Sequence, residues 1–154
     1  MNVNKRVIHH SASGRDSTSV ADIARWHRER GFSQIGYHKV ILGDGSPVPA
    51  SLRENVQDLA NNLQVIRDNI GKSIHINSGY RTPSYNSSTG GSTNSQHLVA
   101  KAADIRVNGV SSSDLHSVIL NLINSGKIKQ GGVGLYRTFV HYDVRGQQAR
   151  WSKI

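Results

Sequence analysis

The 154-residue chain contains no cysteine. Disulfide bonds and thiolate metal sites are therefore excluded, and a zinc ion would have to be bound by His, Asp or Glu. The sequence also lacks any run of about 18 apolar residues, the length that a membrane-spanning helix needs, so we expect no membrane insertion. Its length suits one compact domain with its own core, with room for a small appendage.

Acidic residues are few, with 10 Asp and Glu against 19 Lys and Arg, and the formal net charge is +9. Such a surface favours anionic partners, which include nucleic acid, anionic lipid and acidic cell-wall polymers. The basic residues are spread along the chain, without the dense basic run that is typical of a nucleic-acid-binding arm. We therefore expect an anionic cell-wall polymer as a partner and no nucleic acid.

The first residues, MNVNKRVIHHSAS, have no apolar segment of the kind that a secretory signal needs. We expect synthesis in the cytoplasm, with any access to a cell wall through lysis or a holin-type pore. We also expect a monomer.

Residue patterning predicts a strand, a helix and a strand within the first 45 residues, followed by the proline-bearing junction SPVPAS. From Ser51, apolar residues recur at three- and four-residue intervals up to Ile70, which predicts an amphipathic helix. A strand, a long polar loop over 78–96, a strand, a helix and a hairpin of two strands follow. This order predicts an α+β domain at 50–154, with a small, mainly antiparallel sheet and flanking helices, and an appendage at 1–49.

Two short stretches carry the residues of a candidate metal site. SQHLVAKAAD contains His97 and Asp104, and HYD contains His141 and Asp143. Side chains alternate along a strand, so His141 and Asp143 are expected on the same face. A short connection can bring His97 and Asp104 next to them, which permits a zinc site of His97, Asp104 and His141 with an open fourth position for amide hydrolysis.

Two further residues have a predicted role and an ordinary alternative. Asp143 is the carboxylate nearest in sequence to a proposed ligand, which makes it the candidate catalytic base; alternatively, it pairs with Arg145 or Arg81. Arg81, in SGYRTP, is suited to binding a substrate carboxylate through two hydrogen bonds. Alternatively, Arg81 is an ordinary solvated cation of the loop.

Three motifs now point to a family. SGYRTPSYN, GGSTNSQH with AAD, and GLYRTFVHYDVRGQQARW together resemble the VanY-type zinc D-alanyl-D-alanine carboxypeptidases, in their short phage and bacterial branch, from about Leu52 to Trp151. The resemblance implies a fold shared with the Hedgehog signalling domain and cleavage of peptide bonds in peptidoglycan stems. By position, it implies His97, Asp104 and His141 as zinc ligands and Arg81 as the residue that holds a substrate carboxylate.

The chain departs from this family pattern at two places. Ala100 stands three residues after the first histidine, where the family often has glycine. Many relatives also carry a catalytic Glu or Asp shortly before the last histidine, whereas residues 136–140 contain none. Asp143 is therefore expected to replace it from the other side, with proton transfer from solvent or a tyrosine as the alternatives.

A second resemblance covers the N-terminal segment. VIHHSAS and ARWHRERGFSQIGYHKVILGDG resemble the start of the zinc N-acetylmuramoyl-L-alanine amidases, with His9 at the first zinc-ligand position and Tyr37 at the active-site tyrosine. Those enzymes take a later His and usually a Cys as further ligands, which this chain does not supply. We therefore interpret 1–49 as a truncated, catalytically silent appendage.

The sequence thus predicts a zinc-dependent peptidase acting on peptidoglycan stem peptides at the bacterial cell wall, as a carboxypeptidase or an endolysin endopeptidase. Two alternatives stay open. One is a non-catalytic wall-binding module that keeps the zinc fold, and the other is an amidase.

Overall fold

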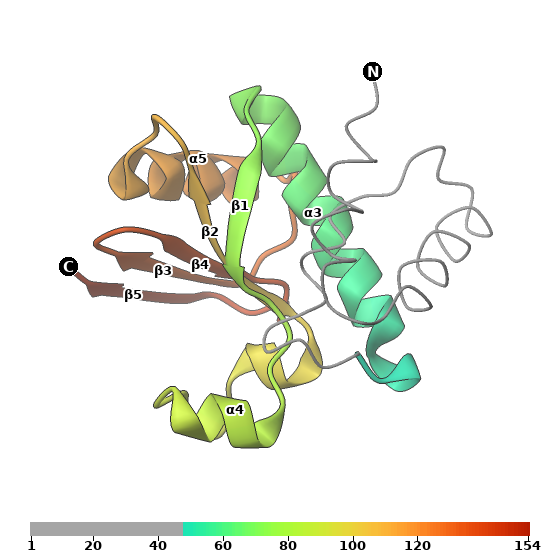
Figure 1. Ribbon diagram of the computed structural model, residues 1–154. Helices are drawn as coiled ribbons and strands as arrows, with labels where there is room; N and C mark the ends of the chain where they lie inside the picture. Colours follow the sequence, from blue (N-terminus) through green and yellow to red (C-terminus); the bar gives the residue numbers. More distant parts are fainter. Residues whose placement is uncertain (1–47) are drawn as a thin grey trace.

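The computed structural model describes residues 48–154. The predicted appendage at 1–49, with His9 and Tyr37, lies outside this range except for its last two residues. Within the described part, the six predicted helices and strands occur in the predicted order, and further short helices and a fifth strand accompany them (Figure 1). They are η2 (Ala50–Leu52), α3 (Arg53–Ile70), β1 (Ile74–Ser78), α4 (Pro83–Ser88), η3 (Gln96–Val99), β2 (Ala102–Val107), α5 (Ser112–Asn124), β3 (Gly132–Tyr136), β4 (Val140–Asp143) and β5 (Ala149–Lys153).

The strands form one five-stranded sheet in the order β1-β2-β4-β3-β5. All neighbouring strands are antiparallel except β3 and β5, which are parallel. The predicted α+β class with a mainly antiparallel sheet is confirmed, as is the β3–β4 hairpin. Strand β5 was not predicted from the sequence, and it completes the sheet at the edge next to β3.

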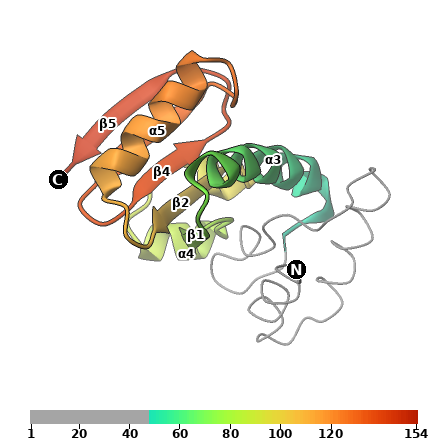
Figure 2. The same ribbon diagram turned by 90° about the horizontal axis from the view of Figure 1, so that it is seen from above.

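Two helices supply most of the core on one side of the sheet. The apolar spacing in α3 buries Leu59, Leu63 and Ile66, and the helix ends at Gly71, which adopts the left-handed conformation with φ 69°. Helix α5 begins at Ser111, whose side chain accepts a hydrogen bond from the backbone N–H of Asp114 (3.0 Å). The two helices contact each other and are seen together from above in Figure 2.

The two faces of the sheet have different composition because side chains alternate along each strand. The face toward the helices carries apolar side chains of the main core, including Ile105, Val133, Val140 and Tyr142. The opposite face carries the polar residues between them, including Asp104 and His141. The predicted functional residues are therefore separated from the core that stabilises the fold.

The long polar segment between β1 and β2 is folded, although it shows no periodicity. Thr82 caps α4 by accepting a hydrogen bond from the backbone N–H of Tyr85 (3.3 Å). A second, smaller apolar cluster of Val56, Tyr80 and Ala100 attaches the segment to α3. The segment is thus held at both ends, and η3 near its end presents His97.

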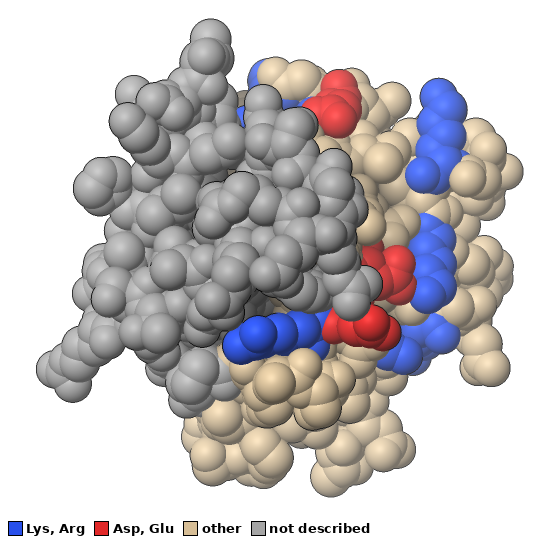
Figure 3. All heavy atoms as spheres, turned by 90° about the vertical axis from the view of Figure 1, so that its right-hand side faces the viewer, with Lys and Arg blue, Asp and Glu red and all other residues tan. Residues whose placement is uncertain are grey.

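The described surface mixes charges of both signs. On the face in Figure 3, Lys and Arg are separated by uncharged residues and accompanied by Asp and Glu, and no continuous basic patch is visible among the described residues. Lys129, for example, pairs with Asp58 at 2.8 Å. No helix within 48–154 is long and apolar enough to cross a membrane.

Candidate metal centre and substrate pocket

One row of residues crosses all five strands on the polar face of the sheet. Ser78 pairs with Asp104, Asp104 with His141, His141 with Gly134, and Gly134 with Trp151. Directly opposed residues on one face of a sheet lie side by side. The sheet register therefore brings Asp104 and His141 together, although they are 37 positions apart in the sequence.

His97 approaches this row from η3. Its Nδ1 lies 2.6 Å from the carbonyl oxygen of Gly79, and its Nε2 lies 3.2 Å from Oδ1 of Asp104. A carbonyl oxygen can only accept a hydrogen bond, so Nδ1 carries a proton, and Nε2 is the ring nitrogen directed toward Asp104. The ring is 3% exposed, and its orientation is fixed by this contact on the side away from Asp104.

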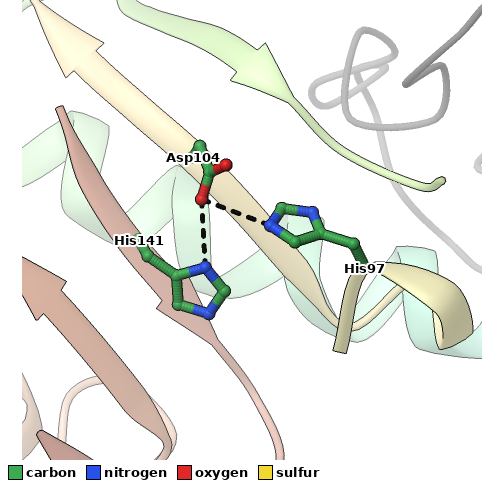
Figure 4. Close-up of side chains that lie close together, drawn as sticks. All are labelled: His97, Asp104 and His141. Atoms are coloured by element: carbon green, nitrogen blue, oxygen red, sulfur yellow. Dashed lines mark hydrogen bonds and ion pairs between the residues drawn. The ribbon is translucent and has the colours of Figure 1, made fainter. Parts of the chain in front are cut away.

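The second histidine meets the same oxygen from the other side. Nδ1 of His141 lies 3.0 Å from Oδ1 of Asp104, and Figure 4 shows both imidazole rings directed toward this carboxylate. The three potential ligand atoms of His97, Asp104 and His141 all lie within 4.8 Å of one another, and all three residues are buried. The structure thus brings the three predicted metal-binding residues together.

Arg81 holds the remaining oxygen of Asp104. Its Nη2 donates to Oδ2 of Asp104 (2.8 Å), and its Nε donates to Oγ of Ser78 (2.7 Å). This leaves Oδ1 of Asp104 turned toward the two histidines. The Arg81 side chain is 15% exposed and lines the pocket described below, so it is not a fully solvated loop cation. Its predicted contact with a substrate carboxylate stays a prediction.

Asp143 lies on the far side of His141. Its Oδ2 is 2.8 Å from Nε2 of His141, and Arg145 donates to both carboxylate oxygens at 2.8 and 2.7 Å. The backbone N–H of Gly132 also donates to Oδ1 (2.9 Å). Of the two sequence-based alternatives for pairing, the structure shows the one with Arg145. The predicted role of Asp143 as the base is not tested by these contacts alone.

The electrostatics of the site follow from these contacts. Burial alone would raise the pKa of Asp104, but its hydrogen bonds with His141 and His97 lower it well below the usual range. Burial would lower the pKa of His141, whereas hydrogen bonds to Asp104 and Asp143 raise it overall. Asp143 follows the pattern of Asp104, because its hydrogen bonds with His141, Arg145 and the Gly132 amide outweigh burial and lower its pKa. Both carboxylates are therefore ionised at neutral pH.

An open pocket of about 600 Å³ lies over the three potential ligands. One side is formed by residues within the segment 89–96, which is rich in glycine and serine. The other side is aromatic: the rings of Tyr136 and Phe139 are stacked with centroids 4.4 Å apart, and the ring of Trp151 lies 5.0 Å from that of His141. The indole N–H of Trp151 donates to Oη of Tyr136 (3.1 Å).

The aromatic side of the pocket escaped the sequence-based prediction of site residues. Trp151 belongs to β5, and only the parallel pairing of β5 with β3 brings it to Gly134. The glycines of GGVGLY were an available signal. A β-carbon at Gly134 would overlap the Trp151 indole, and one at Gly132 would overlap the Asp143 carboxylate.

The donor set suits a metal ion such as zinc, which accepts imidazole nitrogen and carboxylate oxygen. His97 and His141 each bind a fixed partner through one ring nitrogen, the Gly79 carbonyl and the Asp143 carboxylate respectively, and direct the other nitrogen toward Asp104. Second partners of this kind usually accompany metal-binding histidines. Among the described residues, His97, Asp104 and His141 form a group of side chains that could hold a metal ion.

Comparisons with known proteins bear on this geometry. No curated protein matches the sequence. The family model for peptidase M15 matches residues 45–143, and this range contains Arg81, His97, Asp104, His141 and Asp143. The match covers more than half of the chain and confirms the predicted relationship to the VanY-type peptidases. The chain belongs to the peptidase M15 family.

Proposed function

We propose that the protein is a zinc-dependent peptidase that hydrolyses peptide bonds in peptidoglycan stem peptides. One observation supports this above the others. Nε2 of His97 and Nδ1 of His141 converge on Oδ1 of Asp104 at the wall of an open pocket. The membership of the chain in a peptidase family adds the reaction class.

His97, Asp104 and His141 would hold the metal. Three protein ligands of nitrogen and oxygen beside an open pocket are the arrangement of a catalytic zinc site, whereas structural sites have four protein ligands. When bound, zinc supplies Lewis-acid activation of the scissile carbonyl and of a water molecule. Arg81 keeps Asp104 from using Oδ2, so this carboxylate presents a single oxygen to the site.

The charges around the pocket favour an anionic substrate. Arg81, Arg145 and Lys153 line it, against one carboxylate, Asp104. A peptide carries a free carboxylate at its C-terminus, and guanidinium groups bind carboxylates well. The aromatic side offers Trp151 for packing against apolar parts of the substrate. The site of action that follows from this substrate is the bacterial cell wall.

The test combines metal content and product analysis. Elemental analysis of the purified protein should find one zinc per chain, and mass spectrometry of digested peptidoglycan should find products of peptide-bond hydrolysis. His97→Ala should lose both the zinc and the products. His116→Ala is the matched control, because His116 lies on α5, away from the polar face of the sheet, and it should keep both. Wild-type protein that binds zinc and leaves every stem peptide intact would contradict the proposal.

A non-catalytic wall-binding module is the second candidate function. Of the described residues that line the pocket, Asp104 is the only Asp or Glu, and it is assigned to the metal. The pocket therefore shows no second carboxylate for proton transfer among residues 48–154. Sedimentation with purified cell walls separates the candidates: a module would bind walls with zinc present and release no peptide products.

A further inference from the structure

Asp143 lies in the most enclosed position of the metal centre. Its side chain is 0% exposed, and it is two residues beyond His141 on the same face of β4. Oδ2 of Asp143 lies 2.8 Å from Nε2 of His141, while Nδ1 of His141 lies 3.0 Å from Asp104. The imidazole is thus held between two carboxylates, one on the pocket side and one beneath it.

The surroundings of Asp143 fix its own orientation. Arg145 contacts both carboxylate oxygens through Nε and Nη2, at 2.8 and 2.7 Å, and its backbone N–H reaches Oδ1 at 3.2 Å. The amide of Gly132 adds a fourth donor at 2.9 Å. Gly132 also provides the necessary space, because a β-carbon there would overlap the carboxylate. Asp143 therefore cannot rotate away without losing several charge-assisted hydrogen bonds.

This arrangement does not suit a general base. A base must come within hydrogen-bonding distance of the proton that it takes, directly or through one water molecule. His141 and Arg145 line the pocket, whereas Asp143 does not. Both of its oxygens already accept hydrogen bonds, and the ring of His141 lies between it and Asp104.

We propose that Asp143, held by Arg145, is a positioning residue that keeps the His141 ring protonated at Nε2 and directs Nδ1 toward the metal as the ligand atom. This inference rests on the proposed function. A carboxylate behind a metal-binding histidine fixes the tautomer and the ring orientation, and such partners typically contribute 10- to 100-fold to metal affinity. Arg145 acts one step further out, because it touches the carboxylate and not the imidazole.

The central test is Asp143→Asn. Oδ1 accepts from the backbone N–H of Gly132 and from the backbone N–H and Nε of Arg145, so we expect the amide oxygen at that position. The amide NH₂ then takes the place of Oδ2, faces Nε2 of His141 and disfavours the proton there. We expect the zinc dissociation constant, measured by competition with a chromophoric chelator, to rise about 10- to 100-fold. In NMR spectra of the wild type, the proton on Nε2 of His141 should give a slowly exchanging downfield signal, and this signal should be lost in the variant.

Two further variants make the outcome decisive. Asp58→Asn is the control, because Asp58 pairs with Lys129 on the exposed surface of α3. It should change neither the zinc dissociation constant nor the His141 NMR signal. Arg145→Ala leaves the Asp143 carboxylate in place but unsupported, and it should weaken zinc binding about 10-fold. If Asp143→Asn does not fold, Arg145→Ala decides the question.

Failure of the proposed function and failure of the positioning role give different results. A wild-type protein that binds no zinc would refute the proposed function. If the wild type binds zinc, unchanged affinity and an unchanged His141 signal in Asp143→Asn would overturn the positioning role. Unchanged zinc affinity with lost turnover would overturn it in favour of the general base. Unchanged zinc affinity in Arg145→Ala would remove Arg145 from the assignment and, if Asp143→Asn does not fold, would overturn the positioning role itself.

Discussion

The indole of Trp151 lies directly over Gly134, in the space that a side chain at position 134 would occupy. The two residues are partners in the parallel pairing of β3 and β5, and Gly134 is also the partner of His141 in β4. The absence of a side chain in the middle of the row therefore lets the indole approach the histidine, with ring centroids 5.0 Å apart.

Gly134→Ala should force the Trp151 indole away from its present position. Overpacking of this kind costs about 1–3 kcal/mol, so we expect the free energy of unfolding, measured with urea, to fall by that amount. In a Trp151→Ala background the clash is absent, and the same substitution should cost clearly less. Equal costs in both backgrounds would show that the indole does not occupy this space.

Arg81→Lys should weaken zinc binding although it preserves the charge. The guanidinium joins Ser78 to Asp104 through two different nitrogens, and an ammonium group cannot reproduce this geometry. We expect about a 10- to 100-fold loss of zinc affinity in a chelator competition assay. The control is Arg106→Lys on the same strand as Asp104, because Arg106 is exposed and bonds Asn108. A raised KM with unchanged zinc affinity would instead assign Arg81 to the substrate alone.

Ala100 should tolerate glycine and reject a β-branched residue. It has φ 57°, in the left-handed region, and is 1% exposed. Glycine would relieve about 1–2 kcal/mol of backbone strain but would lose the buried methyl group and add chain entropy, so Ala100→Gly should stay within about 1 kcal/mol of the wild type in urea denaturation. Ala100→Val should be destabilised by more than that, and equal stability of the two variants would contradict the assigned conformation.

Zinc should stabilise the protein more at pH 8 than at pH 5.5. Burial notwithstanding, the two neighbouring carboxylates raise the pKa of His141 in the metal-free protein. The stabilisation from His141 is then complete below its unfolded pKa of about 6.5 and is lost as the pH rises through the higher folded value. Zinc affinity, by contrast, should rise with pH, because the ligand nitrogen of His141 must release its proton before it binds the metal.

Protonation of Asp104 and Asp143 lowers the stability of the metal-free protein at acidic pH. The lowered pKa values of Asp104 and Asp143 contribute stability above about pH 4, which is lost as the pH falls toward the folded values. The joint contribution of the three groups should therefore be greatest between about pH 4 and 6.5. Thermal unfolding across pH, with chelator and with excess zinc, measures both dependences. A zinc-induced rise in Tm that is equal at pH 5.5 and pH 8 would contradict this account.

Local patterns were sufficient to predict the strands that carry Asp104 and His141. AADIRV coincides with β2, and the alternation in TFVHYDVRG correctly places His141 and Asp143 on one face. Both predictions depend on the two-residue alternation of side chains along a strand, which can be recognised in the sequence itself. The resemblance of the motifs to a family, which the family comparison confirms, then singled out His97 among the histidines.

Contacts between distant segments could not be predicted in the same way. The carbonyl of Gly79 is a backbone group, so no residue type signals that it accepts from His97. Trp151 depends on the register of a parallel pair, which local periodicity does not encode. The enclosure of Asp143 depends on Gly132 of the neighbouring strand as well as on Arg145, and the sequence alone does not show that Gly132 lies beside it.

The separation of the two sheet faces has a consequence for how this chain can change. We expect substitutions among the apolar residues that face α3 and α5 to alter the free energy of unfolding, and substitutions in the row from Ser78 to Trp151 to alter the candidate metal site and the shape of the pocket. Neighbouring positions along a single strand, such as Val140 and His141, thus belong to the core and to the pocket face respectively. A library that varies only the polar-face positions would change the lining of the pocket while keeping the folding core constant.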